Sequence, residues 1–346
     1  LAARILRGRQ DGMSDSLAAS ATLSRDMVRT TTYALVVVAA LGASVPLWTG
    51  SMPFLLILAS QAVIAAIVAL SLDLLMGSTG LLSFGHAAWY GFGAYLTGLA
   101  AKLLTPEMLI VLPLTLVATI VLATIIGFVL VRQIGKTFAI LTLALGQIMF
   151  ALVFVMSGVT GGEDGLQGIP VPKAFGIPVV RPDVWYWILY GVLLAAILAS
   201  FHIRRSPLGK AWLAIRENTE RARFIGLDTG SLKLLSYVVS ATLAALAGGL
   251  FALFNGAASS DLLNWFESGK VLMYVVLGGV GTLIGPVIGA AVFTITEHYV
   301  SSITNSWLIY FGGFFVLIVI VAPGGLFGAL SSLWSRFGAS RRGAAS

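Results

Sequence analysis

The sequence predicts an all-α protein, a polytopic transmembrane helical bundle, from three observations. Apolar residues make up 58% of the 346 residues and charged residues only 10%, whereas soluble domains carry roughly 25% charged residues. The mean hydropathy is +0.97. Several nearly uncharged runs reach the roughly 20 residues that an α-helix needs to cross a hydrocarbon core of about 30 Å. Because these runs are continuous rather than alternating, they exclude a transmembrane β-barrel.

In chain order the apolar runs predict about ten membrane segments, including one short or broken helix. The first seven lie near 31–50, 53–77, 81–101, 108–131, 138–157, 184–203 and 232–254. Three more follow near 270–281, 284–301 and 307–323. The run at 270–281 is too short to cross alone, so we expect a half helix whose irregular backbone is buried in protein or lines a cavity.

The basic residues predict that both termini are cytoplasmic, because lysine and arginine gather in cytoplasmic loops. In this topology all but four of the 21 lysines and arginines fall inside. Residues 1–12, which precede Met13, are expected to be an extension. The expected parts are an N-terminal tail (1–30), a transmembrane domain (31–330) with a cytoplasmic loop (204–231), and a basic C-terminal tail (331–346).

Composition also limits the function. The chain has no cysteine, which excludes disulfides and thiolate metal sites. Its three histidines have no neighbouring histidine or cysteine cluster, so we expect no metal site. We find no nucleophile next to a general base and therefore expect a non-catalytic protein. The net charge of +7 reports membrane topology, and we expect no nucleic-acid partner.

One polar stretch interrupts the apolar sequence: residues 206–228, SPLGKAWLAIRENTERARFIGLD. Ser206 is a favourable N-cap and Pro207 suits the first helical position. Asn218 is expected to cap a second short helix that Gly226 ends. The stretch is either an interfacial helix lying on anionic lipid or a docking element whose apolar ridge enters a partner's groove. The ridge residues, spaced for one helix face, are Leu208, Ala211, Trp212 and Ile215.

Four stretches of the chain carry a family resemblance. They are GLLSFGHAAWYGFGAYLTGL at 80–99, TGGEDGLQGIP at 160–170, GKAWLAIRENTERARFIGLD at 209–228, and LGGVGTLIGPVIGA at 277–290 with PGGLFG at 323–328. In their residues and in their order along the chain they resemble the permeases of branched-chain amino acid ABC importers, of the type that pairs with a sister permease.

The resemblance implies a permease subunit of an importer in the bacterial inner membrane. Its expected partners are a sister permease, two ATP-binding subunits, a periplasmic substrate-binding protein and the lipid bilayer. The chain itself would bind no cofactor, because ATP would be used by the partner subunits. Branched-chain amino acids are the expected solutes, and relatives of this family also carry urea, amides and small aromatic acids.

The resemblance also implies two docking surfaces. The long outer loop, whose glycines predict a series of turns, would receive the binding protein through Gly161, Gly162, Glu163, Asp164 and Gly165. The cytoplasmic loop would receive the ATP-binding subunits. Its expected contact residues are Leu208, Gly209, Ala211, Trp212, Ile215, Arg216, Glu217, Glu220 and Gly226.

A third set of residues is expected either to pack helices closely or to line the translocation pathway. This set is Gly85, His86, Gly91, Gln147, Gly278, Gly279, Gly281 and Gly285. Asp73 and His86 are placed at similar depth and are expected to pair. Glu297 is expected near the outer surface, with no ligand role.

The alternative function is a stand-alone secondary transporter driven by an ion gradient. Such a transporter needs a carboxylate or cation site at mid-depth in the membrane. We expect the deep polar side chains to be the amides of Gln61 and Gln147, which favours the importer subunit.

Overall fold

A computed structural model describes Val36, residues 39–46, 52–133, 135–304, Ser306, and parts of 309–328. Within the last stretch the described positions are 309–310, 312–313, 316, 320 and 324–328. The predicted segments at 31–50 and 307–323 fall largely outside these residues. The chain forms two compact units, Leu1–Trp48 and Thr49–Ser346, and the account below concerns the second.

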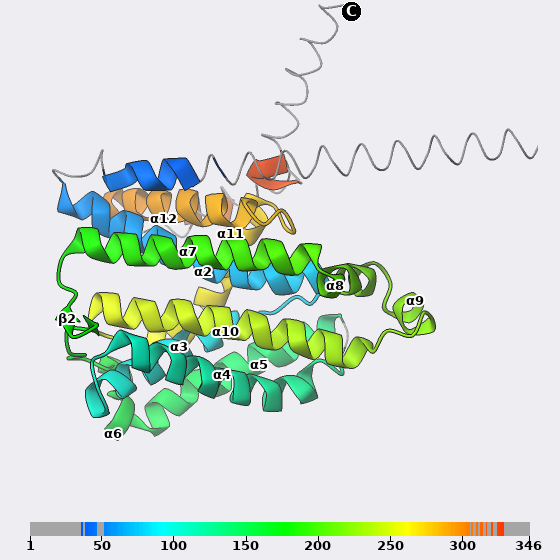
Figure 1. Ribbon diagram of the computed structural model, residues 1–346, viewed down its shortest axis with the longest axis horizontal. Coiled ribbons are helices and arrows are strands. Elements are labelled where there is room, and N and C mark those ends of the chain that lie inside the picture. Colours follow the sequence, from blue (N-terminus) through cyan, green and yellow to red (C-terminus); the bar gives the residue numbers. More distant parts are fainter. Residues whose placement is uncertain are drawn as a thin grey trace, which may run out of the picture. The chain divides into compact units, whose positions relative to one another are not determined.

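The second unit is a helical bundle with one small hairpin (Figure 1). Its first helices are α2 (Pro53–Thr79), α3 (His86–Leu103), α4 (Met108–Leu130), α5 (Lys136–Val155) and α6 (Ser157–Thr160). A 3-10 turn η1 (Gly162–Asp164) leads to the antiparallel strands β1 (Lys173–Ala174) and β2 (Ile177–Pro178). Then come α7 (Pro182–Arg205), α8 (Pro207–Glu217), α9 (Thr219–Phe224), α10 (Thr229–Asn255), η2 (Ser260–Leu263), α11 (Trp265–Gly278) and α12 (Gly285–Ile303).

The all-α prediction is confirmed. Within the described residues, five helices are long and apolar enough to cross a membrane: α2, α4, α5, α7 and α10. The figure of about ten membrane segments stays a prediction. Two boundaries differ from the expectation. The third segment starts at His86 rather than residue 81, and the short segment is α11, Trp265–Gly278, rather than 270–281.

The core lies where α10 packs against α2, α3 and α4, while α2 also packs against α7 and α12. Small residues set the spacing of α3 and α10. A side chain at Gly93 would collide with the backbone of Ala245, and one at Gly248 would collide with the carbonyl of Tyr90. Glycine therefore lets the two backbones touch, as is common in helix packing within membranes.

Two segments enter the bundle without being helical throughout. Residues 80–85 continue as irregular, non-helical chain from the end of α2 before α3 begins. The His86 Nε2 lies 2.7 Å from the Oγ of Ser71. Ser71 lies eight residues before the end of α2, which corresponds to about 12 Å along the helix axis at 1.5 Å per residue. The Ala87 amide donates to Ser268 in the first turn of α11 at 3.0 Å. Both α3 and α11 thus begin inside the bundle, which supports the half-helix prediction.

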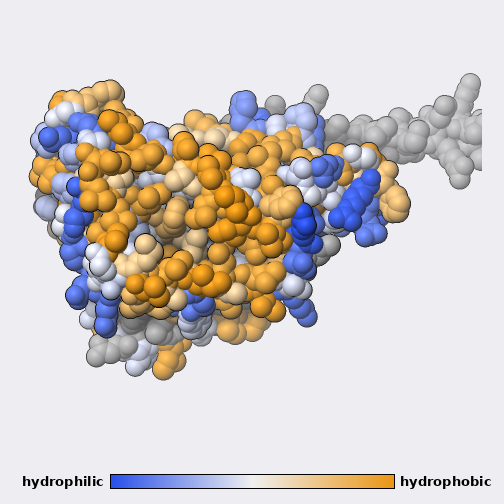
Figure 2. All heavy atoms as spheres, turned by 90° about the horizontal axis from the view of Figure 1, so that it is seen from below, coloured by the Kyte–Doolittle hydropathy of each residue, from blue (hydrophilic) through white to orange (hydrophobic). Residues whose placement is uncertain are grey.

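The outer surface of α4 and α5 is apolar. Figure 2 shows this face, with polar side chains gathered toward its ends. Such a surface suits lipid or another apolar subunit rather than water. The exposed apolar side chains include Ile110, Val117, Val121, Ile125 and Val129 on α4, and Ile140, Ile148 and Leu152 on α5.

Candidate functional site

Residues 206–228 form a helical pair, α8 and α9, at one end of the bundle (Figure 1). The Ser206 Oγ accepts the Gly209 amide at 3.4 Å, and Pro207 occupies the first helical turn. The Asn218 side chain accepts the Arg221 amide at 2.9 Å and begins α9. Gly226 follows α9 with φ +87°. Both predicted caps and the predicted stop are confirmed.

The apolar ridge of α8 faces inward, which corrects one expectation. Trp212 is 0% exposed and Ile215 is 2% exposed. The Trp212 Nε1 donates to the Leu232 carbonyl at the start of α10, at 2.8 Å. The ridge therefore attaches α8 to this chain's own bundle, because burial against neighbouring helices satisfies the same amphipathic pattern as docking to a partner.

The free face of this helical pair lies elsewhere. Phe224 is 87% exposed, Ile225 70% and Leu213 49%. The same helical pair also exposes charged side chains of both signs, among them Glu217, Glu220, Arg221 and Arg223. We call Leu213, Phe224 and Ile225 the exposed apolar patch. The periodicity of α8 did not reveal it, because Phe224 and Ile225 lie at the end of α9, where no helical face continues.

Beneath α8 a buried carboxylate joins three elements, an arrangement we call the Asp73 joint. Asp73 on α2 has a fully buried side chain and pairs with Arg204 Nη2 near the end of α7 at 2.5 Å. Its other oxygen accepts the Gly281 amide at 2.6 Å. Arg204 Nη1 donates to the Gly281 carbonyl at 2.7 Å. A buried carboxylate needs such partners, because an isolated charge in low dielectric is very unfavourable.

Arg216 connects α8 to the same place. Its Nη1 donates to the carbonyl of Gly77 in the last turn of α2. A side chain at Gly281 would approach that Arg216 nitrogen at 3.1 Å, and one at Gly77 would approach the Gly281 Cα at 2.8 Å. The α8–α9 pair, the end of α2 and the turn between α11 and α12 are therefore in direct contact.

The predicted irregular turn after α11 is present. Gly279 has φ +115° and Gly281 has φ +82°, a region that residues with a side chain rarely adopt. Gly278 and Gly285 approach each other so closely that a side chain on either would collide with the other's backbone. These glycines thus fix a tight turn, and the turn contributes its backbone to the Asp73 joint.

The predicted Asp73–His86 pair is wrong. His86 is 1% exposed and its ring contacts Ser71, while the Asp73 carboxylate is occupied by Arg204 and Gly281. Gly85 lies against the backbone of Thr142 on α5. Gly91 lies against the side chain of Leu263. Because α3 starts deep in the bundle, His86 lies further inside than its position in the sequence suggested.

Gln147 is exposed on α5 and contributes nothing to the interior of this chain. The same helix borders an apolar cleft of about 720 Å³. The cleft is lined by Gly80, Leu81, Leu82 and Phe84 of the non-helical segment, by α5 residues Lys136, Ala139, Ile140 and Leu143, and by Trp265 and Gly269 of α11. The GLLSF part of the 80–99 stretch therefore forms one wall of this cleft.

The loop after α6 lies at the opposite end from α8 and α9 (Figure 1). Gly161, Gly162 and Gly165 have φ of +80°, +58° and +70°, as the predicted turns require. Leu166 exchanges two backbone hydrogen bonds with Ala258, at 2.8 and 2.9 Å. The loop is thereby fixed to the connection that precedes α11, and it presents exposed Glu163 and Asp164.

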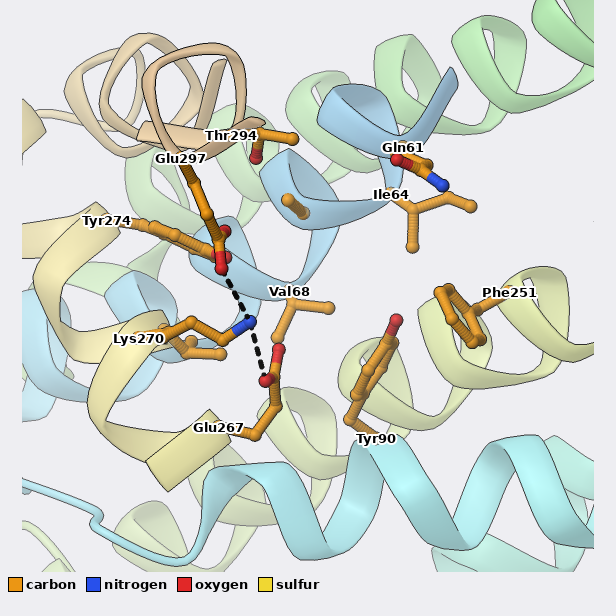
Figure 3. A pocket seen from close by; sticks show the side chains of 12 residues that line it. Gln61, Ile64, Val68, Tyr90, Phe251, Glu267, Lys270, Tyr274, Thr294 and Glu297 are labelled. Atoms are coloured by element: carbon orange, nitrogen blue, oxygen red, sulfur yellow. Dashed lines mark hydrogen bonds and ion pairs between the residues drawn. The ribbon is translucent and has the colours of Figure 1, made fainter. Parts of the chain in front are cut away.

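Sequence reasoning missed one cluster. Lys270 Nζ lies 2.8 Å from Glu267 Oε2 and 3.4 Å from Glu297 Oε1 (Figure 3). The three side chains are 17–22% exposed and line an interior pocket that Gln61 also lines. Glu297 is therefore not at the outer surface, and the expectation that the deep polar side chains are only amides is wrong. The sequence contains one feature that could have indicated this cluster: Glu267 and Lys270 are spaced i, i+3 and stand at the start of an apolar run. Among the described residues no group of three His, Asp or Glu is arranged to hold a metal ion.

Five apolar helices of membrane-spanning length, with a charged helical pair joined to one end of the bundle, indicate an integral membrane protein. The comparisons agree: residues 54–323 match the family described as the permease component of branched-chain amino acid transport systems. The chain belongs to this family, as the four sequence stretches indicated, and it is a multi-pass membrane permease component.

Two characterised relatives illustrate the similarity. The high-affinity branched-chain amino acid transport system permease protein LivM of Salmonella typhimurium is 31% identical over 292 residues, covering 78% of this chain and 69% of LivM. The high-affinity branched-chain amino acid transport system permease protein LivH of Escherichia coli is 24% identical over 283 residues, covering 76% of this chain and 91% of LivH.

A third relative, similar over a shorter stretch, is the autoinducer 2 import system permease protein LsrC of Salmonella paratyphi B. It is 26% identical over 228 residues, which is 62% of this chain and 64% of LsrC. No solved structure shows significant similarity to the chain.

Proposed function

We propose that this chain is the membrane-spanning permease subunit of an ATP-binding-cassette importer for branched-chain amino acids or similar small solutes. It would form the translocation pore with a sister permease, receive solute from a periplasmic binding protein, and take its energy from two ATP-binding subunits. The similarity to both LivM and LivH supports a paired permease. The proposed topology has about ten segments and cytoplasmic termini.

The observation that carries the proposal is the α8–α9 pair and its attachment. The pair exposes the apolar patch, Leu213, Phe224 and Ile225, together with the charged side chains of Glu217, Glu220, Arg221 and Arg223. An apolar patch accompanied by charged side chains suits a protein partner, because burial supplies affinity and the charges set the register. We propose that the ATP-binding subunits dock here, on the cytoplasmic side.

The Asp73 joint explains how docking would reach the membrane helices. Arg216 of α8 holds the Gly77 carbonyl, and Gly281 contacts both Asp73 and Arg204. A displacement of α8 therefore acts on α2, α7 and the turn between α11 and α12 together. Packed elements with discrete contacts transmit motion in this way, since they do not deform continuously.

The apolar cleft beside residues 80–84 is our proposed segment of the translocation pathway. Its wall includes α5, whose outward face carries Gln147 and Ile140. The sister permease would close the cleft along this face. The opposite end of the molecule offers Glu163 and Asp164 on a fixed loop, which suits a docking contact for the binding protein.

The test of docking is a double substitution, Phe224→Asp with Ile225→Asp, in the complex expressed with its ATP-binding subunits. Two exposed apolar side chains lost from an interface reduce affinity by about a hundredfold or more. We expect the ATP-binding subunits to be lost during purification while the permease remains in the membrane. The control is Phe175→Asp, because Phe175 is 86% exposed in the β1–β2 hairpin region at the other end. Full recovery of the ATP-binding subunits with the double variant would refute docking at this patch.

A further inference from the structure

A pocket of about 200 Å³ lies inside the bundle, between α2, α3, α10, α11 and α12. Its α2 residues, Gln61 to Val68, precede the end of α2 at Thr79 by about 16 to 27 Å at 1.5 Å per residue. The pocket therefore lies beside the middle of α2, a helix of 27 residues. Its volume corresponds to about seven water molecules at roughly 30 Å³ each, which suits a small solute.

One wall of the pocket carries a surplus negative charge. Lys270 pairs with both Glu267 and Glu297, so two carboxylates share one ammonium group. No further lysine or arginine lines the pocket. A carboxylate held within a membrane domain without a full counter-charge attracts a cation strongly. A ligand that brings an ammonium group would supply that counter-charge.

The pocket also holds neutral donors without partners. Tyr90 is only 6% exposed, and its hydroxyl has no hydrogen-bond partner among the described residues. Figure 3 shows this hydroxyl directed into the pocket, away from the α3 backbone. The amide of Gln61 is likewise without a partner among the described residues. Polar groups in a protein interior are nearly always paired, so the Tyr90 hydroxyl indicates a missing polar ligand such as a carboxylate, and the partly buried Gln61 amide lines the same pocket.

The remaining lining is apolar. Ile64, Val68 and Phe251 stand beside Tyr90 (Figure 3). The pocket thus combines an anionic wall, two neutral donors and an aliphatic and aromatic surface within the reach of one small molecule. These three surfaces match an ammonium group, a carboxylate and an apolar side chain that are all attached to one carbon.

We propose that this pocket is a binding site within the single subunit for a small aliphatic α-amino acid in its zwitterionic form. The ammonium group lies between Glu267 and Glu297, the carboxylate accepts from Tyr90 and Gln61, and the side chain contacts Ile64, Val68 and Phe251. The proposal rests on the proposed function for its solute class, and it adds a site separate from the cleft beside residues 80–84.

The test measures binding of L-leucine to the purified full-length chain, without ATP-binding subunits, by radioligand binding and by thermal unfolding. We expect leucine to bind and to raise the unfolding temperature, as any ligand specific for the folded state does. The comparison probes are 3-methylbutylamine, which lacks the carboxylate, and 4-methylpentanoate, which lacks the ammonium group. We expect the amine to bind about tenfold or more weaker, and the acid weaker still.

Variants assign the binding to the pocket. Glu297→Gln and Tyr90→Phe should each weaken leucine binding by about ten- to a hundredfold, since hydrogen bonds to charged groups are lost. Asp183→Asn, a carboxylate in an exposed pair with Arg181, should leave binding unchanged. Tyr90→Phe removes one hydroxyl and keeps the ring, so it tests the site even where Glu297→Gln lowers stability.

Three results would overturn the proposal. They are no leucine binding by the wild-type chain at tens of millimolar, equal binding by wild type and Tyr90→Phe, and binding of the amine as tight as that of leucine. The last would identify a simple cation site. Because this assay contains no ATP-binding subunit, its failure leaves the docking proposal standing, and a failure of docking leaves leucine binding to the chain unaffected.

Discussion

At the scale of single residues, Asp73 stands out because one carboxylate holds α2, α7 and the turn after α11. Asp73→Ala would leave Arg204 without its counter-charge in a largely buried place, and breaking a buried pair in this way costs about 3–5 kcal/mol. We expect a clear fall in the unfolding temperature of the purified protein and loss of uptake. Asp183→Ala is the matched control, because its pair with Arg181 is exposed on both sides and such pairs contribute about 0–1 kcal/mol. Equal effects of the two substitutions would contradict the importance of the joint.

Gly281 gives a second prediction at this scale. Gly281→Ala places a side chain where φ is +82° and where Arg216 lies 3.1 Å from the new carbon. The backbone strain alone costs about 1–2 kcal/mol, so we expect reduced stability and reduced uptake. Gly191→Ala is the control: it lies within helix α7 with open space around it, and alanine favours a helix there by up to about 1 kcal/mol. Thermal unfolding in detergent measures the stability of both variants. A Gly281→Ala protein as stable as wild type would contradict the tight turn.

At the scale of elements, α8 depends on Trp212 for its place on the bundle. Trp212→Ala removes a fully buried side chain and its bond to Leu232, a change that costs about 3–5 kcal/mol. We expect α8 and α9 to detach locally, which increases cleavage by trypsin at Arg221 and Arg223. The control is Leu213→Ala on the same helix, where the side chain is 49% exposed and digestion should match wild type. Unchanged digestion of Trp212→Ala would show that other contacts hold the segment.

The caps of α8 and α9, the apolar face of α8 and the glycine stop after α9 could be predicted from the sequence, since each depends on residues within one or two turns. Ser206, Asn218 and Gly226 are examples. What α8 packs against could not be predicted, because an apolar ridge has the same pattern whether it meets a partner or its own chain. The depth of Glu297 was missed for a similar reason: its partner Lys270 lies 27 residues away, and only the packing of α11 against α12 brings them together.

At the scale of the whole molecule, the two ends of the bundle are predicted to lie on opposite sides of the membrane. The chain has no cysteine, so single cysteines at Lys210, Glu163 and Ser302 can be labelled with an impermeant maleimide without a background. We expect labelling of Glu163→Cys and Ser302→Cys from outside intact cells. Lys210→Cys should react only after the membrane is opened. Labelling of Lys210→Cys and Glu163→Cys from the same side would contradict the proposed orientation.

The Asp73 joint has a consequence for how this family is studied through comparison of sequences. Arg216 holds the carbonyl of Gly77, and Arg204 holds the carbonyl of Gly281. Every amino acid carries a carbonyl, so a change at either glycine does not call for a compensating change at the arginine that binds it. Statistical covariation between alignment columns should therefore be weak across these contacts, although they connect α7 and α8 to the membrane helices. Maps of residue coupling derived from covariation would omit this connection, and substitution of the arginines themselves is the direct way to detect it.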